Sequence, residues 1–185
     1  VADARMRTFN RDGSEGAIAG NNLRCVGKYL YDHGFVKGEA FTIETGSGVK
    51  GVRVFTRHGE VTYATVDLGP VDLNPAAMPS TLGGGRAVDY PLTVGDETVR
   101  VTCVTVGNPH CVVFADKVDD ADLAHLGSML EHSPYFPQRV NTEVIRVANK
   151  NTIKMRVWER GNGEVVASGT GACAAAVAAV ENGYC

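Results

Sequence analysis

Residues 164–182 read EVVASGTGACAAAVAAVEN, and this stretch decides the fold of the second half of the chain. After Ser168 it consists almost entirely of alanine, glycine and valine. A helix that is apolar on every side is a buried helix. Serine is also a preferred N-cap, because its hydroxyl accepts a backbone N–H of the first turn. The sequence therefore predicts a buried helix over residues 169–182 that begins directly after Ser168.

The first half contains a shorter counterpart of this stretch. Each copy has a glutamate, three residues, a small residue, a glycine and a polar residue: Glu15-x-x-x-Ala19-Gly20-Asn21 and Glu164-x-x-x-Ser168-Gly169-Thr170. After the first copy, apolar residues recur at helical spacing until His33-Gly34, a usual helix stop. Two similar strand-to-helix junctions favour a duplicated fold with pseudo-symmetric lobes. Chance similarity is the alternative, because short glycine motifs are common.

Apolar runs separated by turn residues fill the rest of the chain. Strands are expected over residues 6–10, 40–45, 51–56, 60–68, 98–106, 111–114, 140–147 and 152–159. Residues 69–90 contain prolines and three consecutive glycines, which is typical of a connection between lobes. A further helix, capped by Asp119 or Asp120, is expected to run to about Glu131. This order predicts an α/β (α+β) fold with an N-terminal lobe over residues 1–72 and a C-terminal lobe over residues 73–185.

Composition excludes several classes of function. The 185 residues carry a formal net charge of −3, and the charges are interspersed, so the footprint of a nucleic-acid-binding protein is missing. No apolar run approaches the roughly 18 residues that a membrane span needs. Nothing at the start of the sequence points to export, which makes the cytoplasm the expected location. The missing initiator Met and an end directly after a helix stop indicate a fragment.

The cysteines are scattered along the chain and include no C-x-x-C pair. An odd, scattered set is poor evidence for disulfides or for a zinc site. We therefore expect small, buried apolar residues in a reducing cytoplasm at all five positions: Cys25, Cys103, Cys111, Cys173 and Cys185.

Both helix starts are candidate anion sites, because free N–H groups and the helix dipole favour negative charge there. Two such ends facing each other would bind a carboxylate, and the residue before each glycine would flank the α-carbon from opposite sides. That geometry suits a two-base inversion, for which a cysteine at a helix N-terminus is well poised. The sequence instead has Ala19, which has no proton to exchange, and Ser168, a much weaker acid whose alternative role is the N-cap. Cys25 and Cys173 lie too far into their helices to replace these thiols.

Several other polar residues are weak candidates when taken singly. His110 follows Asn108-Pro109 and is more often a turn residue in such a context than a catalyst. Glu159 and Arg160 stand at a strand end, where a solvated pair is the usual interpretation. Asn10 and Asn141 complete this set.

Taken together, these segments resemble the diaminopimelate epimerase family. The resemblance rests on the stretch from Phe9 to Asp32, on Gly107-Asn108-Pro109-His110, on Asn141-x-Glu143, and on Glu159-Arg160-Gly161 with the segment from Ala167 to Cys173. Their order and spacing cover almost the whole chain. The resemblance implies that about fifty residues of the family precede this stretch and that a final segment follows it, so that both lobes are incomplete. It also implies two lobes, each a mixed sheet wrapped around a central helix, with the ligand in the cleft.

The resemblance assigns a role to each matching position. The residues that match the group holding the distal, non-reacting amino-acid centre are Asn10, Asn108, Asn141 and Arg160. Those that match the group binding the reacting carboxylate are Gly20, Asn21, Gly169 and Thr170. Glu159 matches a residue that contacts the reacting amino group, and Glu159 and His110 match the pair that supports the two bases. Ala19 and Ser168 stand where the family has its two cysteines.

The activity implied is the interconversion of LL- and meso-2,6-diaminopimelate, a diamino acid of lysine and peptidoglycan synthesis, without pyridoxal phosphate or metal. A homodimer is also implied, because members of the family tend to dimerise. Three interpretations of the missing thiols stay open. They are an engineered, trapped epimerase, a natural variant that uses another base or a water, and a protein that binds the diamino acid without turnover. In a related isomerase, His110 or Glu159 would be the working base.

Overall fold

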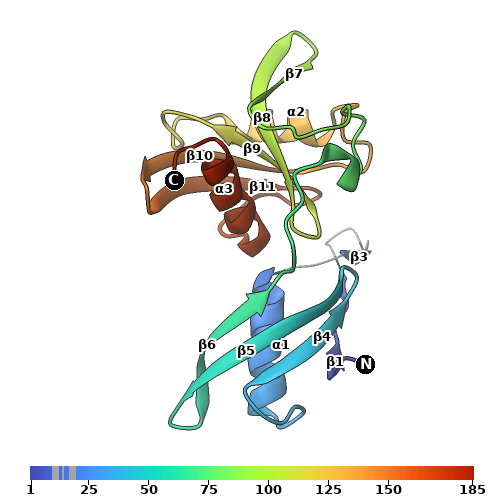
Figure 1. Cartoon of the computed structure of the whole chain (residues 1–185), viewed down its shortest axis with the longest axis vertical. Helices are drawn as coiled ribbons and strands as arrows, with labels where there is room; N and C mark the ends of the chain where they lie inside the picture. The colour runs from blue at the N-terminus through green and yellow to red at the C-terminus, as the bar shows by residue number, and fades with distance from the viewer. Residues whose placement is uncertain (10–12, 14, 17–19) are drawn as a thin grey trace. The chain divides into compact units, whose positions relative to one another are not determined.

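A computed structural model describes residues 1–9, 13, 15–16 and 20–185. The chain divides into two compact units, residues 1–70 and 71–185 (Figure 1). Each unit contains a mixed β-sheet and a 13-residue helix that begins at the glycine of the repeated motif. The predicted α+β class with mixed sheets is therefore confirmed.

Unit 1 is a four-stranded sheet with one helix. The strand order is β1-β4-β5-β6, in which β1 runs parallel to β4 and the other pairs are antiparallel. The bounds are β1 (Ala4–Arg5), β4 (Ala40–Thr45), β5 (Gly48–Arg57) and β6 (Glu60–Asp67). A separate pair is formed by β2 (Thr8–Phe9) and β3 (Glu15–Gly16). Of the strand expected over residues 6–10, Thr8 and Phe9 form β2, Met6 and Arg7 lie outside any strand, and residue 10 is outside the described residues.

Helix α1 (Gly20–Asp32) packs against β5 and β6 and buries Leu23 and Gly27. Its end is a Schellman motif: the N–H of Gly34 donates to Tyr31 O at 3.0 Å and that of Phe35 to Leu30 O at 2.9 Å. Gly34 has a φ of 69°, which glycine adopts without strain. The predicted helix stop at His33-Gly34 is confirmed.

Unit 2 is built on a six-stranded sheet of order β12-β11-β10-β9-β8-β7. Only β9 and β10 pair in parallel among these described strands. The bounds are β7 (Tyr90–Val94), β8 (Glu97–Thr105), β9 (Pro109–Phe114), β10 (Asn141–Asn149), β11 (Thr152–Glu159) and β12 (Gly163–Val165). A short 3-10 helix, η1 (Pro75–Ala77), lies in the stretch that was expected to connect the lobes.

Helices α2 (Leu123–Glu131) and α3 (Gly169–Glu181) cover opposite faces of this sheet (Figure 1). Successive side chains of a strand point to opposite faces. On β9, Cys111 and Val113 accordingly pack in one core with Leu130 of α2, whereas Val112 packs in the other core with the alanines of α3.

Two helix predictions need correction. The N-cap of α2 is Asp122, whose carboxylate accepts the N–H of His125 at 3.0 Å, so neither Asp119 nor Asp120 caps this helix. Helix α3 begins at Gly169 as predicted, but it is buried on one side only. Its exposed positions include Ala172, Ala176 and Val180, because the sheet contacts a single face of the helix.

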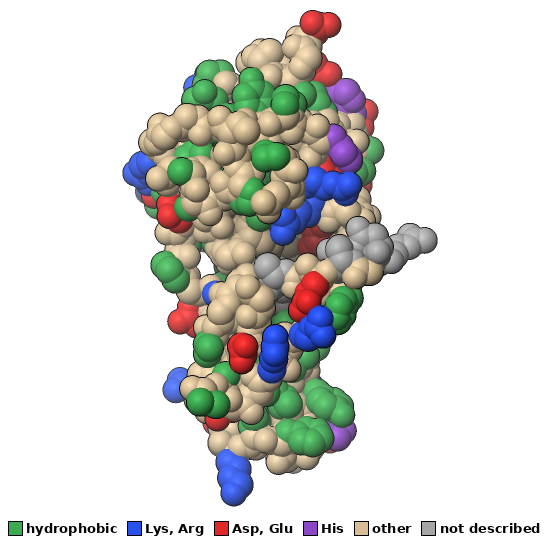
Figure 2. Space-filling model, turned by 90° about the vertical axis from the view of Figure 1, so that its right-hand side faces the viewer, with side chains coloured by type: hydrophobic (Ala, Val, Ile, Leu, Met, Phe, Trp, Pro, Cys, Tyr) green, Lys and Arg blue, Asp and Glu red, His purple; other side chains and the backbone are tan. Residues whose placement is uncertain are grey.

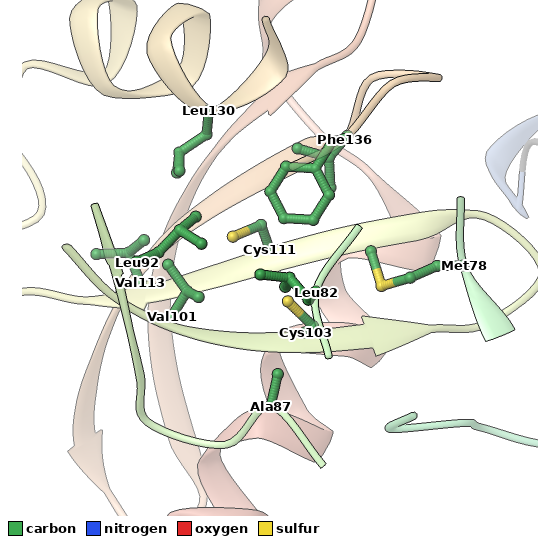
Figure 3. Packing of buried hydrophobic residues seen from close by; sticks show 11 residues of the cluster. Met78, Leu82, Ala87, Leu92, Val101, Cys103, Cys111, Val113, Leu130 and Phe136 are labelled. Carbon is green, nitrogen blue, oxygen red and sulfur yellow. The ribbon is translucent and has the colours of Figure 1, made fainter. Parts of the chain in front are cut away.

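The cysteines divide into two groups. Cys103 and Cys111 are directly opposite each other on β8 and β9 and lie in the core beneath Leu130 and Phe136 (Figure 3). The adjacent Cys103 thiol, followed by burial, raises the pKa of the Cys111 thiol well above its usual value. Cys25, Cys173 and Cys185 are exposed, so the expectation of five buried cysteines is wrong for these three.

Thiol titration tests this division. In the native chain, 5,5′-dithiobis(2-nitrobenzoate) should react rapidly with the three exposed thiols, because it needs an accessible thiolate. The remaining two should react only after denaturation. Cys173→Ser should remove one rapid equivalent, whereas Cys111→Ser should leave the rapid count unchanged. Four or more rapid equivalents in the native chain would contradict the packing.

A second test concerns the contact between α2 and β11. A Cβ added at Gly127 would lie 2.6 Å from Trp158 Cβ, closer than real Cβ contacts. Because overpacking costs about 1–3 kcal/mol, Gly127→Ala should lower the free energy of unfolding by that amount in urea. The control is Gly84→Ala, which meets nothing within 4 Å. It should have no effect or stabilise by up to about 1 kcal/mol. Equal changes in the free energy of unfolding for Gly127→Ala and Gly84→Ala would show that Trp158 does not pack on Gly127.

Candidate functional site

Ser168 is the N-cap of α3. Its backbone is extended, with φ −137° and ψ 120°, and its Oγ accepts the N–H of Gly171 at 3.2 Å. Ser168 and Thr170 are both buried, and their hydroxyl oxygens lie 3.5 Å apart. The first turn of any α-helix leaves N–H groups without intrahelical partners, so this end of α3 is a positive, donor-rich position.

The parallel pairing of β9 with β10 brings a histidine and a carboxylate together next to this helix end. His110 is opposite Asn141, and Val112 is opposite Glu143, so His110 and Glu143 are diagonal neighbours on the same face. His110 Nδ1 lies 2.7 Å from Glu143 Oε1, and both side chains are completely buried. A Cβ at Gly171 would lie 2.6 Å from that same oxygen, so the first turn of α3 rests directly on Glu143.

Asn108 links this buried pair to the start of α3. Its Oδ1 lies 3.0 Å from His110 Nε2, and its Nδ2 donates to Thr170 Oγ1 at 3.2 Å. A continuous chain of contacts therefore runs from Glu143 through His110, Asn108 and Thr170 to Ser168. The interpretation of His110 as a turn residue is wrong, because it lies within β9 and is inaccessible to solvent.

A second buried carboxylate, Glu131 at the end of α2, fixes the turn after β11. Its Oε2 accepts the indole N–H of Trp158 at 2.7 Å, and its Oε1 accepts the backbone N–H of Gly161 at 2.8 Å. Arg139 Nη1 donates to the same Oε1 at 3.3 Å. Glu131 is only 2% exposed, so it acts inside the fold rather than toward solvent.

The same turn carries Glu159 and Arg160, which are both half-buried. The N–H of Arg160 donates to Asn141 Oδ1 at 3.0 Å, and Asn141 Nδ2 donates to Pro109 O at 3.1 Å. Asn141 therefore ties the start of β9 and the turn to β10. Burial lowers the pKa of the Arg160 guanidinium from its usual value, an effect that Glu131 opposes. Glu159 and Arg160 are both partly buried, which argues against the interpretation of these two residues as a solvated pair.

The predicted site residues fall into three groups. Those within unit 2 are Asn108, His110, Asn141, Glu159, Arg160, Ser168, Gly169 and Thr170. Gly20 and Asn21 form the start of α1 in unit 1, where Arg24 donates to Asn21 Oδ1. Asn10 and Ala19 lie outside the described residues. The contact of each residue with a ligand stays a prediction, as does the joining of the two helix ends at one ligand.

The sequence assigned no role to Glu143 or to Glu131. Glu143 stands in the quoted Asn141-x-Glu143 segment, and the signal for a buried position was the apolar run around it. Glu131 stands four residues after Gly127 and one after Leu130, both on the buried side of α2. In each case a charged residue at a core position was the available signal.

Charged side chains of both signs lie singly or in small groups over the face shown in Figure 2. Within the described ranges, no group of three or more His, Cys, Asp or Glu side chains is placed to hold a metal ion. None of the helices in the part of the chain that the structure describes is long and apolar enough to cross a bilayer.

Solved structures with this fold define the class. A hydroxyproline epimerase from Agrobacterium vitis, solved with bound trans-4-OH-L-proline, superimposes with a TM-score of 0.71 and 16% identity, over 98% of this chain and 56% of that one. A Bacillus anthracis phenazine biosynthesis protein of the PhzF family gives 0.61 and 17%, over 97% of this chain and 62% of that one. At these identities the likeness establishes the fold alone. The chain is thus an α+β protein of the fold shared by these two proteins.

Sequence comparison then assigns the family. The profile of diaminopimelate epimerase matches residues 1–73 and 102–185, so the chain belongs to the diaminopimelate epimerase family. The diaminopimelate epimerase of Desulfovibrio desulfuricans is 50% identical over 190 residues, which cover 100% of this chain and 66% of the relative. That of Pelotomaculum thermopropionicum is 46% identical, over 99% of this chain and 65% of the relative. The chain thus spans just under two thirds of the length of these relatives.

The role of Glu131 in holding the turn after β11 is testable. Glu131→Gln places amide protons against N–H donors, so it should lower the free energy of unfolding by about 1–3 kcal/mol. The substitution leaves one acceptor oxygen for three donors, so the contact with Trp158, the single tryptophan, should be weakened or lost and its fluorescence emission should change in the native state.

The matched control is Glu164→Gln on the adjacent strand β12. Glu164 forms a surface ion pair with Arg156, and surface pairs contribute little to stability. A Glu131→Gln variant that matches this control in stability and in Trp158 emission would show that Glu131 does not hold the turn.

Proposed function

We propose that this chain is the core of a cofactor-independent amino-acid epimerase that interconverts LL- and meso-2,6-diaminopimelate by two-base proton transfer at the α-carbon. The proposal places it in the cytoplasm and in lysine and peptidoglycan precursor synthesis. It is supported by the family and by the names of relatives such as the one that is 50% identical. The observation that carries it is the convergence of Asn108, Thr170 and Ser168 at the N-terminus of α3.

The start of α3 suits the carboxylate of an amino acid. A helix N-terminus offers N–H donors and a partial positive charge, and both also stabilise the charge that develops when an α-proton leaves. In the proposal, Gly169 and Thr170 bind the reacting carboxylate together with Gly20 and Asn21 of α1. Glu159 contacts the reacting amino group.

The distal amino-acid centre is assigned to Asn10, Asn108, Asn141 and Arg160. The contacts of Asn141 refine its role, because both polar atoms of its side chain are engaged with backbone groups. Asn141 would then act by holding the turn at Arg160, and the guanidinium would make the contact with the ligand.

The proton-transfer step lacks its thiols. Alanine at position 19 has no exchangeable proton on its side chain. The Ser168 hydroxyl accepts a backbone N–H as the helix cap, and its other described partner is the Thr170 hydroxyl, which is no base. This observation favours a second candidate function, in which the chain binds the diamino acid and does not turn it over.

Restoring both thiols is the direct test. In deuterium oxide, the full chain with Ala19→Cys and Ser168→Cys should incorporate deuterium at the α-carbon of diaminopimelate, as measured by mass spectrometry. The unaltered chain should be slower by at least about 10²-fold, the usual contribution of one positioned acid or base. Each single cysteine variant is the control: its rate of interconversion of LL- and meso-diaminopimelate, measured by chiral chromatography, should stay near that of the unaltered chain, because inversion needs both groups.

The remaining outcomes separate the alternatives. Binding of diaminopimelate by the unaltered chain in calorimetry, without exchange, supports the non-catalytic function. Exchange by the unaltered chain that disappears in His110→Ala would favour an isomerase with His110 as its base. A double cysteine variant that binds diaminopimelate but incorporates no deuterium would contradict the assignment of positions 19 and 168.

A further inference from the structure

The imidazole of His110 lies between two oxygen atoms that both accept hydrogen bonds. Glu143 Oε1 is 2.7 Å from Nδ1, and Asn108 Oδ1 is 3.0 Å from Nε2. A neutral imidazole carries one proton and can donate to only one of two acceptors. The other ring nitrogen would then direct a lone pair at an oxygen. With the Asn108 oxygen facing the ring, both contacts are hydrogen bonds only if the ring and the carboxyl group together hold one more proton.

Burial leads to the same count of protons. His110 and Glu143 are completely inaccessible, and Glu143 Oε2 has no hydrogen-bond partner among the described residues. In that part of the chain, His110 is the sole ion-pair partner of Glu143. A carboxylate beside a neutral histidine would leave a full negative charge buried, which is costly. The additional proton makes the pair neutral overall.

The position of that proton follows from the neighbours of Glu143. Imidazole is a stronger base than a carboxylate, so the proton is expected on the ring. The first turn of α3 adds to this preference, because Gly171 rests on Oε1 and a helix N-terminus stabilises a negative charge by its partial positive charge. The pair is then an imidazolium next to a carboxylate, with both ring N–H groups donating.

We propose that Glu143 is a positioning residue that keeps His110 as an imidazolium. Its Nε2–H then donates to Asn108 Oδ1 and turns the Asn108 amide nitrogen toward Thr170 at the start of α3. His110 is in this state a donor without a lone pair, so it supports the site by orientation and is not the base. The catalytic meaning of this arrangement rests on the proposed function, whereas the protonation of His110 does not.

The test is nuclear magnetic resonance of the full chain labelled with ¹⁵N in its histidine rings, near pH 7 and without ligand. His110 should show two ring N–H groups, both protected from exchange with water, and ¹⁵N shifts typical of an imidazolium. Glu143→Gln should reduce the ring to one proton, because a neutral amide cannot balance the cation. Gly171→Ala is a second variant that keeps both partners and displaces the carboxylate, and it should weaken the Nδ1–H signal.

The matched control is the pair of His125 and Glu97, which has the same 2.7 Å contact but is more than half exposed. Its ring protons should exchange rapidly, and Glu97→Gln should leave both His110 signals unchanged. A single ring proton on His110 in the unaltered chain would overturn the proposal, and so would two protons that persist in Glu143→Gln. Because no substrate is present, this result is independent of the deuterium exchange that tests the proposed function.

Discussion

The parallel pairing of β9 with β10 is the constraint on which the rest of unit 2 depends. Parallel neighbours cannot be joined by a tight turn, so the chain must cross the sheet between them. The crossover contains α2, whose last residue Glu131 reaches the turn after β11. The pairing also sets the register that places His110 diagonal to Glu143 on the face covered by α3. This one pairing therefore positions both parts of the polar framework, which are the pair of His110 and Glu143 and the contacts of Glu131 with the turn after β11.

Two buried carboxylates hold that framework in place by different means. Glu131 receives three N–H donors, from Trp158, Gly161 and Arg139, so its charge is dispersed over a turn and a strand. Among the described residues, Glu143 has one hydrogen-bonding partner, His110, and it lies against the first turn of α3. Buried polar groups without partners are costly, so each carboxylate strongly restricts the groups around it. The turn after β11 and the start of α3 are ordered by these restrictions.

The start of α3 combines the features that an anionic amino-acid group needs with a residue that does not suit proton transfer. Serine is a good helix cap because its hydroxyl accepts a backbone N–H, and Ser168 is used in this way. A thiol at the same place would gain acidity from the helix dipole. Serine at position 168 thus keeps the helix cap, whereas under the proposed function it would weaken the acid–base chemistry. Under the proposed function, binding and turnover would therefore be separable in this chain.

The sequence alone determined the features that depend on local periodicity and capping. Alternation and turn residues located β4, β10 and β11, and Gly169 marked the start of α3. It also showed that position 168 carries no thiol. Only the tertiary structure decided that Asp122 caps α2, that α3 is buried on one side, and that Glu143 and Glu131 are internal partners of the site. These features depend on strand register and on which element covers which face of the sheet. Both are set by contacts between residues that are far apart in the chain, so local sequence patterns do not reveal them.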